Sequence, residues 1–547
     1  DILGIDLSEH HRALADAMAT KDLFLSLLDR ASRWPPEALE EIARVAQGSD
    51  WPLAQVFRDL ANERASQGTR LALGEGSRQM GEFALLAPSR EEDLPPLEPR
   101  AEPIPIEANR LASLLEPKGL FAQQFTKYEY RPQQVEMLRQ VVEAFNMPDH
   151  LLVEAGTGTG KSMAYLLPAI YYAVNNGRRV IVSTNTINLQ EQLFTKDIPD
   201  LQRILPLEFR AALLKGRSNY LCLRRLGVFR RSRQFTQDEV RVLAKVLAWL
   251  PTTQTGDRSE LVLTNSDQDV WTNIQAASES CMGDNCPYRR TGQCFFYRAR
   301  ARAERAHIVI VNHALLLSDL ALENRILPEY KHLIIDEAHH LEEQATSQFG
   351  FEIGQRDLYA FLVNLSHESG NVPGGLLSTV PGLLQNDLVP NSTRQTVTGF
   401  LQTLQSEIDN AQRRLFELFN TLTIFISNHE MGGKSQDLYD QPVPLTSGLR
   451  TQPDWPAVEI AWESFATPLR QVLRNLERLV SQLEGIKSEN PLERDEIIQD
   501  IKAQVQMGNA MWDNLDQILM KPEPDGIYWI SVSGRNQELT LCSAPLH

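Results

Sequence analysis

The chain has 547 residues, a net charge of −17 at pH 7 and five cysteines. Its length suggests about three or four domains at roughly 150 residues each. The only long apolar run, Met163 to Val174, is well short of the roughly 20 residues that a membrane-spanning helix needs, and the first residues do not resemble a signal peptide. We therefore expect no membrane partner.

The cysteine content also limits where the protein works. A small, odd number of cysteines without a secretory start favours a reducing compartment, where clustered cysteines bind metals more often than they form disulfides. We therefore expect a cytoplasmic protein.

The N-terminal part of the chain is predicted to be helical. Apolar residues recur at helical spacing within the first thirty residues, and a second helix is expected from Pro36 to Gln47, closed by Gly48. Six prolines alternate with acidic residues between Pro88 and Pro105, a composition typical of an extended linker. We place the clearest domain boundary there.

After the linker, short apolar runs alternate with predicted helices. Four runs, HLLVEAG, RRVIVST, HIVIVNH and HLIIDEA, are apolar throughout, as in strands buried on both faces of a parallel sheet. From about residue 355 to 520, apolar residues recur at intervals of three and four, which predicts an all-helical region. Two final strands are expected in GIYWISVSG and ELTLCSAPL. The predicted fold class is α/β, a parallel-sheet domain with helical insertions.

The sequence AGTGTGKS, residues 155–162, lies between a predicted strand and a predicted helix, which is the context of a P-loop. Its glycines let backbone N–H groups point at phosphates. Lys161 is expected to reach the β and γ phosphates, and Ser162 to bind Mg²⁺. Ala155 stands where the general motif has its first glycine. The residues expected to bind nucleotide here are Gly156, Gly158, Gly160, Lys161 and Ser162.

The sequence IIDEAHH places two carboxylates at the end of another predicted strand, where ligands bind in open α/β sheets. Asp336 is expected to hold Mg²⁺, and Glu337 to orient or deprotonate the attacking water. With the P-loop, these residues predict hydrolysis of ATP, with Lys161, Asp336 and Glu337 as the catalytic residues.

Four of the five cysteines lie between the P-loop and the DEAH sequence, with the spacing C-x58-C-x4-C-x7-C. Four thiolates can hold either tetrahedral zinc or an iron–sulfur cluster, and the spacing leaves the metal undecided. The predicted ligands are Cys222, Cys281, Cys286 and Cys294. The fifth, Cys542, is expected to be an ordinary strand residue.

Basic residues surround these cysteines. Seven basic residues and no acidic one lie between Lys215 and Arg233, and six arginines accompany one glutamate between Tyr288 and Arg305. Because local patches rather than net charge decide phosphate contacts, these stretches predict a nucleic-acid surface on an acidic chain. The candidate phosphate-binding residues are Arg217, Arg224, Arg225, Arg289 and Arg290.

Several of these motifs resemble those of superfamily 2 helicases. DEAH and AGTGTGKS occur in the expected order, and the resemblance places His339 at the nucleotide site. YEYRPQQ is similar to the Q motif, which makes Gln134 a candidate for reading adenine. STNTINLQEQL is similar to motif Ia, which makes Thr184, Thr186 and Gln190 candidates for contacts with single-stranded DNA.

The cysteine segments KGRSNYLC, CPY and CFFYRARARAERAHIVIVNHALL resemble the DinG branch of the XPD-like iron–sulfur helicases, and the resemblance covers about residues 120–547. It implies a RecA-like motor domain, a [4Fe–4S] cluster held by the four cysteines, and a helical arch after the DEAH strand. It also implies ATP-dependent unwinding with 5′ to 3′ polarity in DNA repair or replication. The implied partners are single-stranded DNA and DNA junctions, and we expect a monomer.

Two other functions remain open at this point. One is an ATP-switched protein that binds single-stranded nucleic acid through a structural metal domain; Glu337 argues against it, since a pure switch needs no hydrolytic glutamate. The other is a bifunctional exonuclease and helicase in the parent chain, because HHRALADA, with His11 and Asp16, resembles the last motif of DEDDh-type exonucleases.

We rank scaffolding above redox sensing as the role of the cluster.

No Q-x-x-G-R-x-x-R sequence of a second motor domain is present. We therefore expect a fragment that binds nucleotide and DNA but unwinds poorly. The predicted domains are an exonuclease-like remnant (1–32), a helical connector (33–87), a linker (88–117), motor domain 1 in two parts (118–215 and 306–350), an iron–sulfur domain (216–305), a helical arch (351–522) and return strands (523–547).

Overall fold

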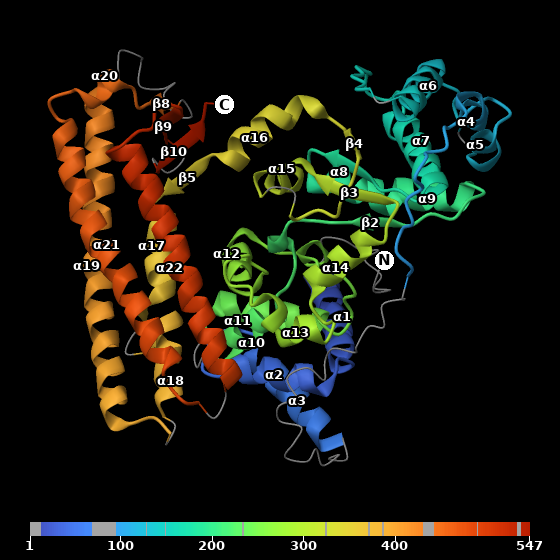
Figure 1. Ribbon diagram of the computed structural model, residues 1–547. Coiled ribbons are helices and arrows are strands. Elements are labelled where there is room, and N and C mark those ends of the chain that lie inside the picture. Colours follow the sequence, from blue (N-terminus) through green and yellow to red (C-terminus); the bar gives the residue numbers. More distant parts are fainter. Residues whose placement is uncertain are drawn as a thin grey trace. The chain divides into compact units, whose positions relative to one another are not determined.

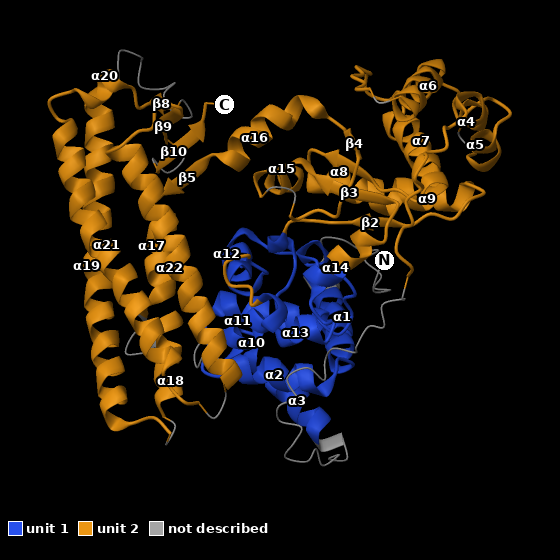
Figure 2. Cartoon of the chain, viewed as in Figure 1, with its two compact units in different colours: residues 1–92, 217–277, 283–298 blue, residues 93–216, 278–282, 299–547 orange. Residues whose placement is uncertain are grey.

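The computed structural model describes residues 13–67, 94–126, 128–147, 149–231, 235–322, 325–369, 372–385, 388–429, 442–488, 491–532 and 538–546. The chain divides into two compact units, coloured separately in Figure 2. The smaller unit combines residues 1–92, 217–277 and 283–298. The larger unit combines residues 93–216, 278–282 and 299–547. None of the described helices has the length and apolar character that crossing a membrane requires.

A parallel four-stranded sheet lies in the larger unit (Figure 1). Its strands are β1 (Val180–Thr184), β2 (Ala211–Leu213), β3 (Ile308–Asn312) and β4 (His332–Ile335). Their order is β2-β3-β1-β4, and β1 is parallel to both of its neighbours. Every residue of β1 is buried, as expected of a central strand with helices on both faces. The predicted α/β class is confirmed, as are three of the four predicted strands of this sheet.

The strand predicted before the P-loop, HLLVEAG, is wrong. Residues 150–156 form no strand, and the side chain of Leu152 is 94% exposed. Among the described residues, β4 pairs only with β1, so this segment has no ladder with the edge of the sheet. An apolar run is compatible with a strand, but hydrogen bonding to a neighbour decides whether one forms.

Helices flank the sheet and contribute the core of this part of the larger unit. They are α4 (Ala108–Leu114), α5 (Leu120–Gln124), α6 (Pro132–Asn146), α7 (Lys161–Asn176), α8 (Ile187–Gln192), α9 (Ile198–Ile204), α15 (His313–Ala321) and α16 (Leu341–Phe349). A short π-helical turn, Leu193–Asp197, joins α8 to α9.

The described part of the proline-rich linker packs against this domain. The backbone N–H of Ile104 donates to the Asn176 side chain over 2.6 Å, and that of Ile106 donates to the Asn146 side chain over 2.7 Å. At Gly177, where φ is 56°, a Cβ atom would lie 2.0 Å from the carbonyl oxygen of Glu98. Glycine is therefore required for the linker to run along the end of α7.

The predicted helical region forms, but it is not all-helical: it also contains an antiparallel pair of short strands, β6 (His367–Ser369) and β7 (Val372–Gly374), and the short strand β8 (Val443–Pro444). Its long helices are α19 (Asn391–His429), α21 (Trp455–Glu484) and α22 (Pro491–Leu519), accompanied by α17 (Gln355–Leu365), α18 (Val380–Leu384) and α20 (Ser447–Arg450). They share one hydrophobic core, and Figure 1 shows α19, α21 and α22 running side by side.

The two predicted final strands also form, as β9 (Gly526–Val532) and β10 (Leu539–Pro545). They pair antiparallel with each other and belong to a separate sheet of order β5-β10-β9-β8, with β5 (Phe351–Gly354) and β8 (Val443–Pro444). Cys542 is buried in β10, as expected of an ordinary strand residue.

The smaller unit joins N-terminal helices to the cysteine-bearing insertion. Its helices are α1 (Ala13–Ser32), α2 (Pro36–Val45), α3 (Ala54–Gln67), α10 (Leu223–Arg230), α11 (Gln237–Trp249), α12 (Asn265–Ile274) and α13 (Pro287–Arg290), and α14 (Phe295–Glu304) begins in it. Leu39 and Ile42 of α2 share a core with Val240 and Leu247 of α11. The segment predicted as a connector is thus part of the same packed unit as the insertion.

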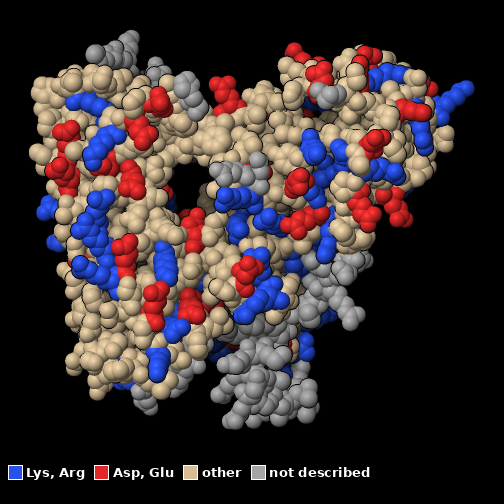
Figure 3. All heavy atoms as spheres, in the orientation of Figure 1, with Lys and Arg blue, Asp and Glu red and all other residues tan. Residues whose placement is uncertain are grey.

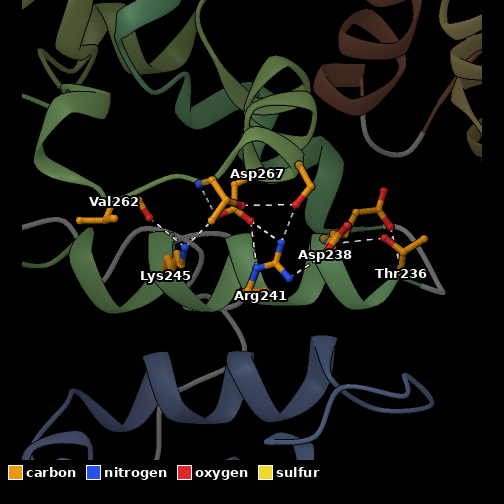
Figure 4. Close-up of polar contacts among 9 residues, drawn as sticks. Thr236, Asp238, Arg241, Lys245, Val262 and Asp267 are labelled. Atoms are coloured by element: carbon orange, nitrogen blue, oxygen red, sulfur yellow. Dashed lines mark hydrogen bonds and ion pairs between the residues drawn. The ribbon is translucent and has the colours of Figure 1, made fainter. Parts of the chain in front are cut away.

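A buried carboxylate holds α11 against the start of α12 (Figure 4). The side chain of Asp267 is fully buried and accepts hydrogen bonds from Arg241 over 2.6 Å and from Lys245 over 2.7 Å. The backbone N–H of Thr264 donates to it over 2.9 Å, completing a capping box for α12. Burial acts to raise the pKa of Asp267, but the hydrogen bonds from Lys245, Thr264 and Arg241 outweigh it and hold the pKa well below its usual value.

Replacing Asp267 with asparagine is expected to destabilise the smaller unit by about 2 kcal/mol, because two partly buried cations lose their common anion. A depressed pKa means that this stabilisation is present above the pKa of the unfolded state, about 4 for aspartate, and is lost as the pH falls below it. Hydrogen–deuterium exchange of peptides from residues 236–274 should therefore speed up in Asp267→Asn at pH 7.

The matched control is Asp238→Asn, which removes a half-exposed partner of the same Arg241. An exposed ion pair contributes at most about 1 kcal/mol, so exchange in this variant should stay close to wild type. Equal exchange in wild type and Asp267→Asn would contradict the prediction.

Candidate nucleotide site and DNA-binding elements

The P-loop adopts a conformation that its glycines permit. Gly158 and Gly160 have φ angles of 82° and 80°, a region that costs other residues energy. Arg131 donates to the Gly158 carbonyl oxygen over 2.5 Å, and Gln134 donates through Nε2 to the Gly160 carbonyl oxygen over 2.9 Å. Gln134 is almost fully buried, so in this structure it supports the loop. The role of Gln134 in reading adenine stays a prediction.

The predicted catalytic residues meet beside the P-loop. Lys161 is the first residue of α7, and its Nζ lies 2.8 Å from Oε1 of Glu337. Asp336 directly follows β4, and its Oδ2 accepts a hydrogen bond from the Tyr165 hydroxyl over 3.2 Å. The structure therefore brings together three residues that lie as much as 176 positions apart in the sequence.

Each of these groups alters the ionisation of its neighbours. The hydrogen bond from Lys161 lowers the pKa of Glu337, and the same bond raises the pKa of Lys161. Burial, and then the Glu337 charge, raise the pKa of Asp336. Lys161 and Glu337 thus form an ion pair beside the P-loop.

The oxygen ligands predicted for Mg²⁺ lie near one another. The hydroxyl groups of Ser162 and Tyr165 are hydrogen-bonding neighbours, and Tyr165 also contacts Asp336. Hydroxyl and carboxylate oxygens are the ligands that Mg²⁺ prefers, so this donor set fits the ion. His339 is mostly exposed, and its Nδ1 lies 3.6 Å from Oε2 of Glu337. Gly156 accepts a hydrogen bond from Thr159.

The residues predicted to contact single-stranded DNA differ in accessibility. Thr186 is exposed, and its hydroxyl accepts the Leu189 N–H and caps α8. Thr184 and Gln190 are fully buried. Gln190 donates to the carbonyl oxygens of Leu214 and Ile310, which anchors α8 to the sheet. In this structure direct contact with DNA is open to Thr186, whereas Thr184 and Gln190 position the segment.

Sequence reasoning missed Lys215, which lies next to this segment. Its side chain is 1% exposed, and its Nζ lies 2.6 Å from Oε1 of Glu191 in α8. Lys215 and Glu191 are not neighbours in the sequence, so no local pattern indicates that they pair. The sequence shows only the basic stretch to which Lys215 belongs. It attaches α8 to the strand that leads into the cysteine-bearing insertion.

The five candidate arginines of the smaller unit are not equally accessible. Arg290 is exposed, whereas Arg224 is 2% exposed and does not present its charge to solvent. Arg225 donates to the Gln275 carbonyl oxygen over 2.8 Å. Arg217 and Arg289 lie on aromatic rings: their Cζ atoms are 4.2 Å from the ring centre of Phe296 and 3.9 Å from that of Tyr297.

On the face shown in Figure 3, lysine and arginine side chains are interspersed with acidic side chains. Local basic patches thus coexist with the net charge of −17. This distribution is compatible with the nucleic-acid surface predicted around the cysteines.

None of the five cysteines forms a disulfide. Cys222, Cys286 and Cys294 lie in the smaller unit, directly before α10, α13 and α14. Burial raises the pKa of the Cys222 thiol, and the nearby Cys286 raises it further, so these two thiols are neighbours. Across the described parts of the chain, no three potential metal ligands are assembled into one site. Four free thiols have the chemistry that an iron–sulfur cluster needs, and the shared site stays a prediction.

Two regions of the chain match known families: residues 131–220 match "DEAD/DEAH box helicase" and residues 277–358 match "DEAD_2". The first contains the P-loop and the second contains the DEAH sequence. These regions therefore coincide with the site described above.

Named relatives extend the similarity. The chain is 29% identical to the "3'-5' exonuclease DinG" of Bacillus subtilis over 98% of this chain and 55% of that protein. It is 40% identical to the "ATP-dependent helicase DinG" of Mycobacterium tuberculosis over 40% of this chain and 36% of that protein. It is 36% identical to the "ATP-dependent DNA helicase YoaA" of Haemophilus influenzae over 46% of this chain and 39% of that protein.

A solved structure described as "XPD_Helicase" matches 76% of this chain and 54% of its own, with 12% identity and a TM-score of 0.37. The chain spans between 36% and 55% of the length of the relatives named above. The chain thus carries two regions that match helicase families, and it is similar to proteins named DinG and YoaA.

Proposed function

We propose that this chain supplies the ATP-hydrolysing part of an ATP-dependent DNA helicase that moves on single-stranded DNA with 5′ to 3′ polarity. The observation that carries the proposal is the meeting of Lys161, Asp336 and Glu337 beside the P-loop, with 2.8 Å between the Lys161 Nζ and the Glu337 carboxylate. This arrangement supports phosphoryl transfer to water.

In the proposed reaction, a water oxygen bonds to the γ-phosphorus while the bond from that phosphorus to the β,γ-bridging oxygen breaks. The water proton passes to the Glu337 carboxylate, and the products are ADP and phosphate. Lys161 exchanges Glu337 for the β and γ phosphates when ATP binds, which frees the carboxylate to face the water. Asp336 and Ser162 would hold Mg²⁺, which neutralises phosphate charge when bound.

We further propose that Cys222, Cys281, Cys286 and Cys294 hold a [4Fe–4S] cluster whose main role is structural. The basic and aromatic residues around them support contact with DNA phosphates and bases, through exposed Arg290 and through Arg217 and Arg289 on their aromatic rings. In the larger unit, exposed Thr186 is the candidate for a contact with the strand.

The proposal extends to junction-containing DNA, a monomeric state and a cytoplasmic location; the name of the Haemophilus influenzae relative supports DNA as the partner. A nuclease in the parent protein is a second candidate. It is favoured by the name of the Bacillus subtilis exonuclease DinG, whose similarity extends over 98% of this chain. Asp16 lies on α1, whereas His11 falls outside the described residues.

The test is release of phosphate from ATP by the purified chain, with and without single-stranded oligonucleotide and with blunt duplex as the control DNA. We expect hydrolysis that requires Mg²⁺ and is stimulated by the single strand more than by the duplex. No hydrolysis would overturn the enzyme assignment. Hydrolysis indifferent to DNA would overturn the helicase assignment.

A further inference from the structure

A buried histidine lies behind the carboxylates of the nucleotide site. His313 is the first residue of α15, directly after β3, and its side chain is fully buried. Its Nδ1 lies 2.8 Å from the hydroxyl oxygen of Ser183 in β1. Because β1 and β3 are adjacent and parallel, with Ser183 opposite Val311, this contact joins the carboxyl ends of two strands.

The same serine also contacts the residue that carries the predicted magnesium ligand. The Asp336 N–H donates to the Ser183 carbonyl oxygen over 2.8 Å. Backbone groups of Glu337 and Asp336 face the His313 ring: burial lowers the pKa of His313, and hydrogen-bonding interactions with these backbone groups act in the opposite direction. Nε2 has no hydrogen-bond partner of ordinary geometry among the described residues. The neutral His313 ring is therefore held by Ser183 and interacts with the backbone of Asp336 and Glu337.

Glu337 needs such support because its backbone is strained. Its φ of 55° makes it the only residue other than glycine with a positive φ in the described parts of the chain. The left-handed region costs a residue with a side chain about 1–2 kcal/mol. A residue stays in such a conformation only where its surroundings fix it. The strain falls on the residue whose carboxylate must aim at the attacking water.

We propose that His313 is a positioning residue for ATP hydrolysis: held by Ser183, its ring supports the backbone of Asp336 and of the left-handed Glu337 and so orients the Glu337 carboxylate. The inference rests on the proposed ATPase function. The ring interacts with the backbone of the hydrolytic residue, whereas Lys161 contacts the Glu337 side chain. Its loss should therefore slow the chemical step more than it weakens ATP binding.

The test compares His313→Ala with wild type in steady-state ATP hydrolysis and in direct binding of a fluorescent ATP analogue. We expect kcat to fall by about 10-fold to 100-fold, the effect of a misplaced catalytic group, with KM and analogue affinity within about twofold of wild type. Ser183→Ala, which removes only the hydroxyl group, should produce a smaller fall in kcat. The double variant should lose less than the product of the two single losses, because both act through one contact.

The matched control is His332→Ala. His332 also lies in the sheet, at the first residue of β4, where its ring packs 4.6 Å from that of Tyr172, and burial likewise lowers its pKa. Truncating it disturbs the same sheet without touching Glu337, so its kcat should stay near wild type.

Wild-type kcat in folded His313→Ala would overturn the inference. So would a loss of ATP affinity as large as the loss of kcat, or an equal loss of kcat in His332→Ala. If His313→Ala does not fold, Ser183→Ala decides: a lower kcat at unchanged KM supports the inference, and an unchanged kcat overturns it. Failure of the proposed function itself looks different, because the wild-type chain would then hydrolyse no ATP.

Discussion

Replacing Glu337 with glutamine should lower kcat for ATP hydrolysis by about 100-fold to 10,000-fold, the range typical of a lost general base. The hydrogen bond from Lys161 lowers the pKa of Glu337, so the carboxylate is ionised at neutral pH and able to accept a proton. An amide of the same shape keeps the packing but accepts no proton. ATP affinity should be retained or increased, because in the variant Lys161 gives up no carboxylate when phosphate binds.

Phosphate release and binding of a fluorescent ATP analogue measure these two quantities separately. Glu343→Gln is the matched control, since Glu343 lies six residues further along in α16, is largely exposed and has its carboxylate 3.9 Å from the His340 ring. Its kcat should equal that of wild type. Normal turnover in Glu337→Gln would refute the role given to Glu337, and loss of ATP binding would show that the substitution damaged the whole site.

Replacing Cys222 with serine should remove most of the iron and acid-labile sulfide from protein purified without oxygen. Serine is a poor replacement for a thiolate ligand, and a cluster with three of its four cysteines is expected to be lost. Cys222 is the predicted ligand whose thiol interacts with that of Cys286 in the structure. Iron, sulfide and visible absorbance per chain are the measurements.

Cys542→Ser is the control for this experiment. It removes a buried cysteine of β10 that also contacts Ser531, but one that the proposed cluster does not use. Iron and sulfide should match wild type in this variant. Zinc without sulfide in the wild-type protein would contradict the cluster and leave a structural zinc site, the alternative that four thiolates also permit.

The predictions that succeeded were local in the sequence. The P-loop needs glycines at positions of positive φ, and Gly158 and Gly160 occupy two of them. The apolar runs predicted β1, β3 and β4, and β1 and β3 are buried as expected where helices cover both faces of a sheet. The long helices of residues 391–519 follow from the spacing of their apolar residues.

Predictions about individual polar side chains were less reliable. A motif identifies Thr184 and Gln190, and a basic stretch identifies Arg224. Neither pattern indicates whether these side chains will be buried. All three are buried in the structure, and the Gln190 side-chain amide donates hydrogen bonds to two backbone carbonyl oxygens. These two hydrogen bonds fix the Gln190 side chain in place, even though its motif suggests a ligand.

The sequence alone therefore indicated the resemblance to helicases, the nucleotide-binding motifs and most of the regular elements, because each depends on residues close together in the chain. The tertiary structure decided what depends on distant residues: the pairing of Lys161 with Glu337, the support of Glu337 by His313, the missing strand before the P-loop and the shared core of α2 and α11. Contacts between remote segments form only when the whole chain buries its apolar surface, and no local pattern records which segments will meet.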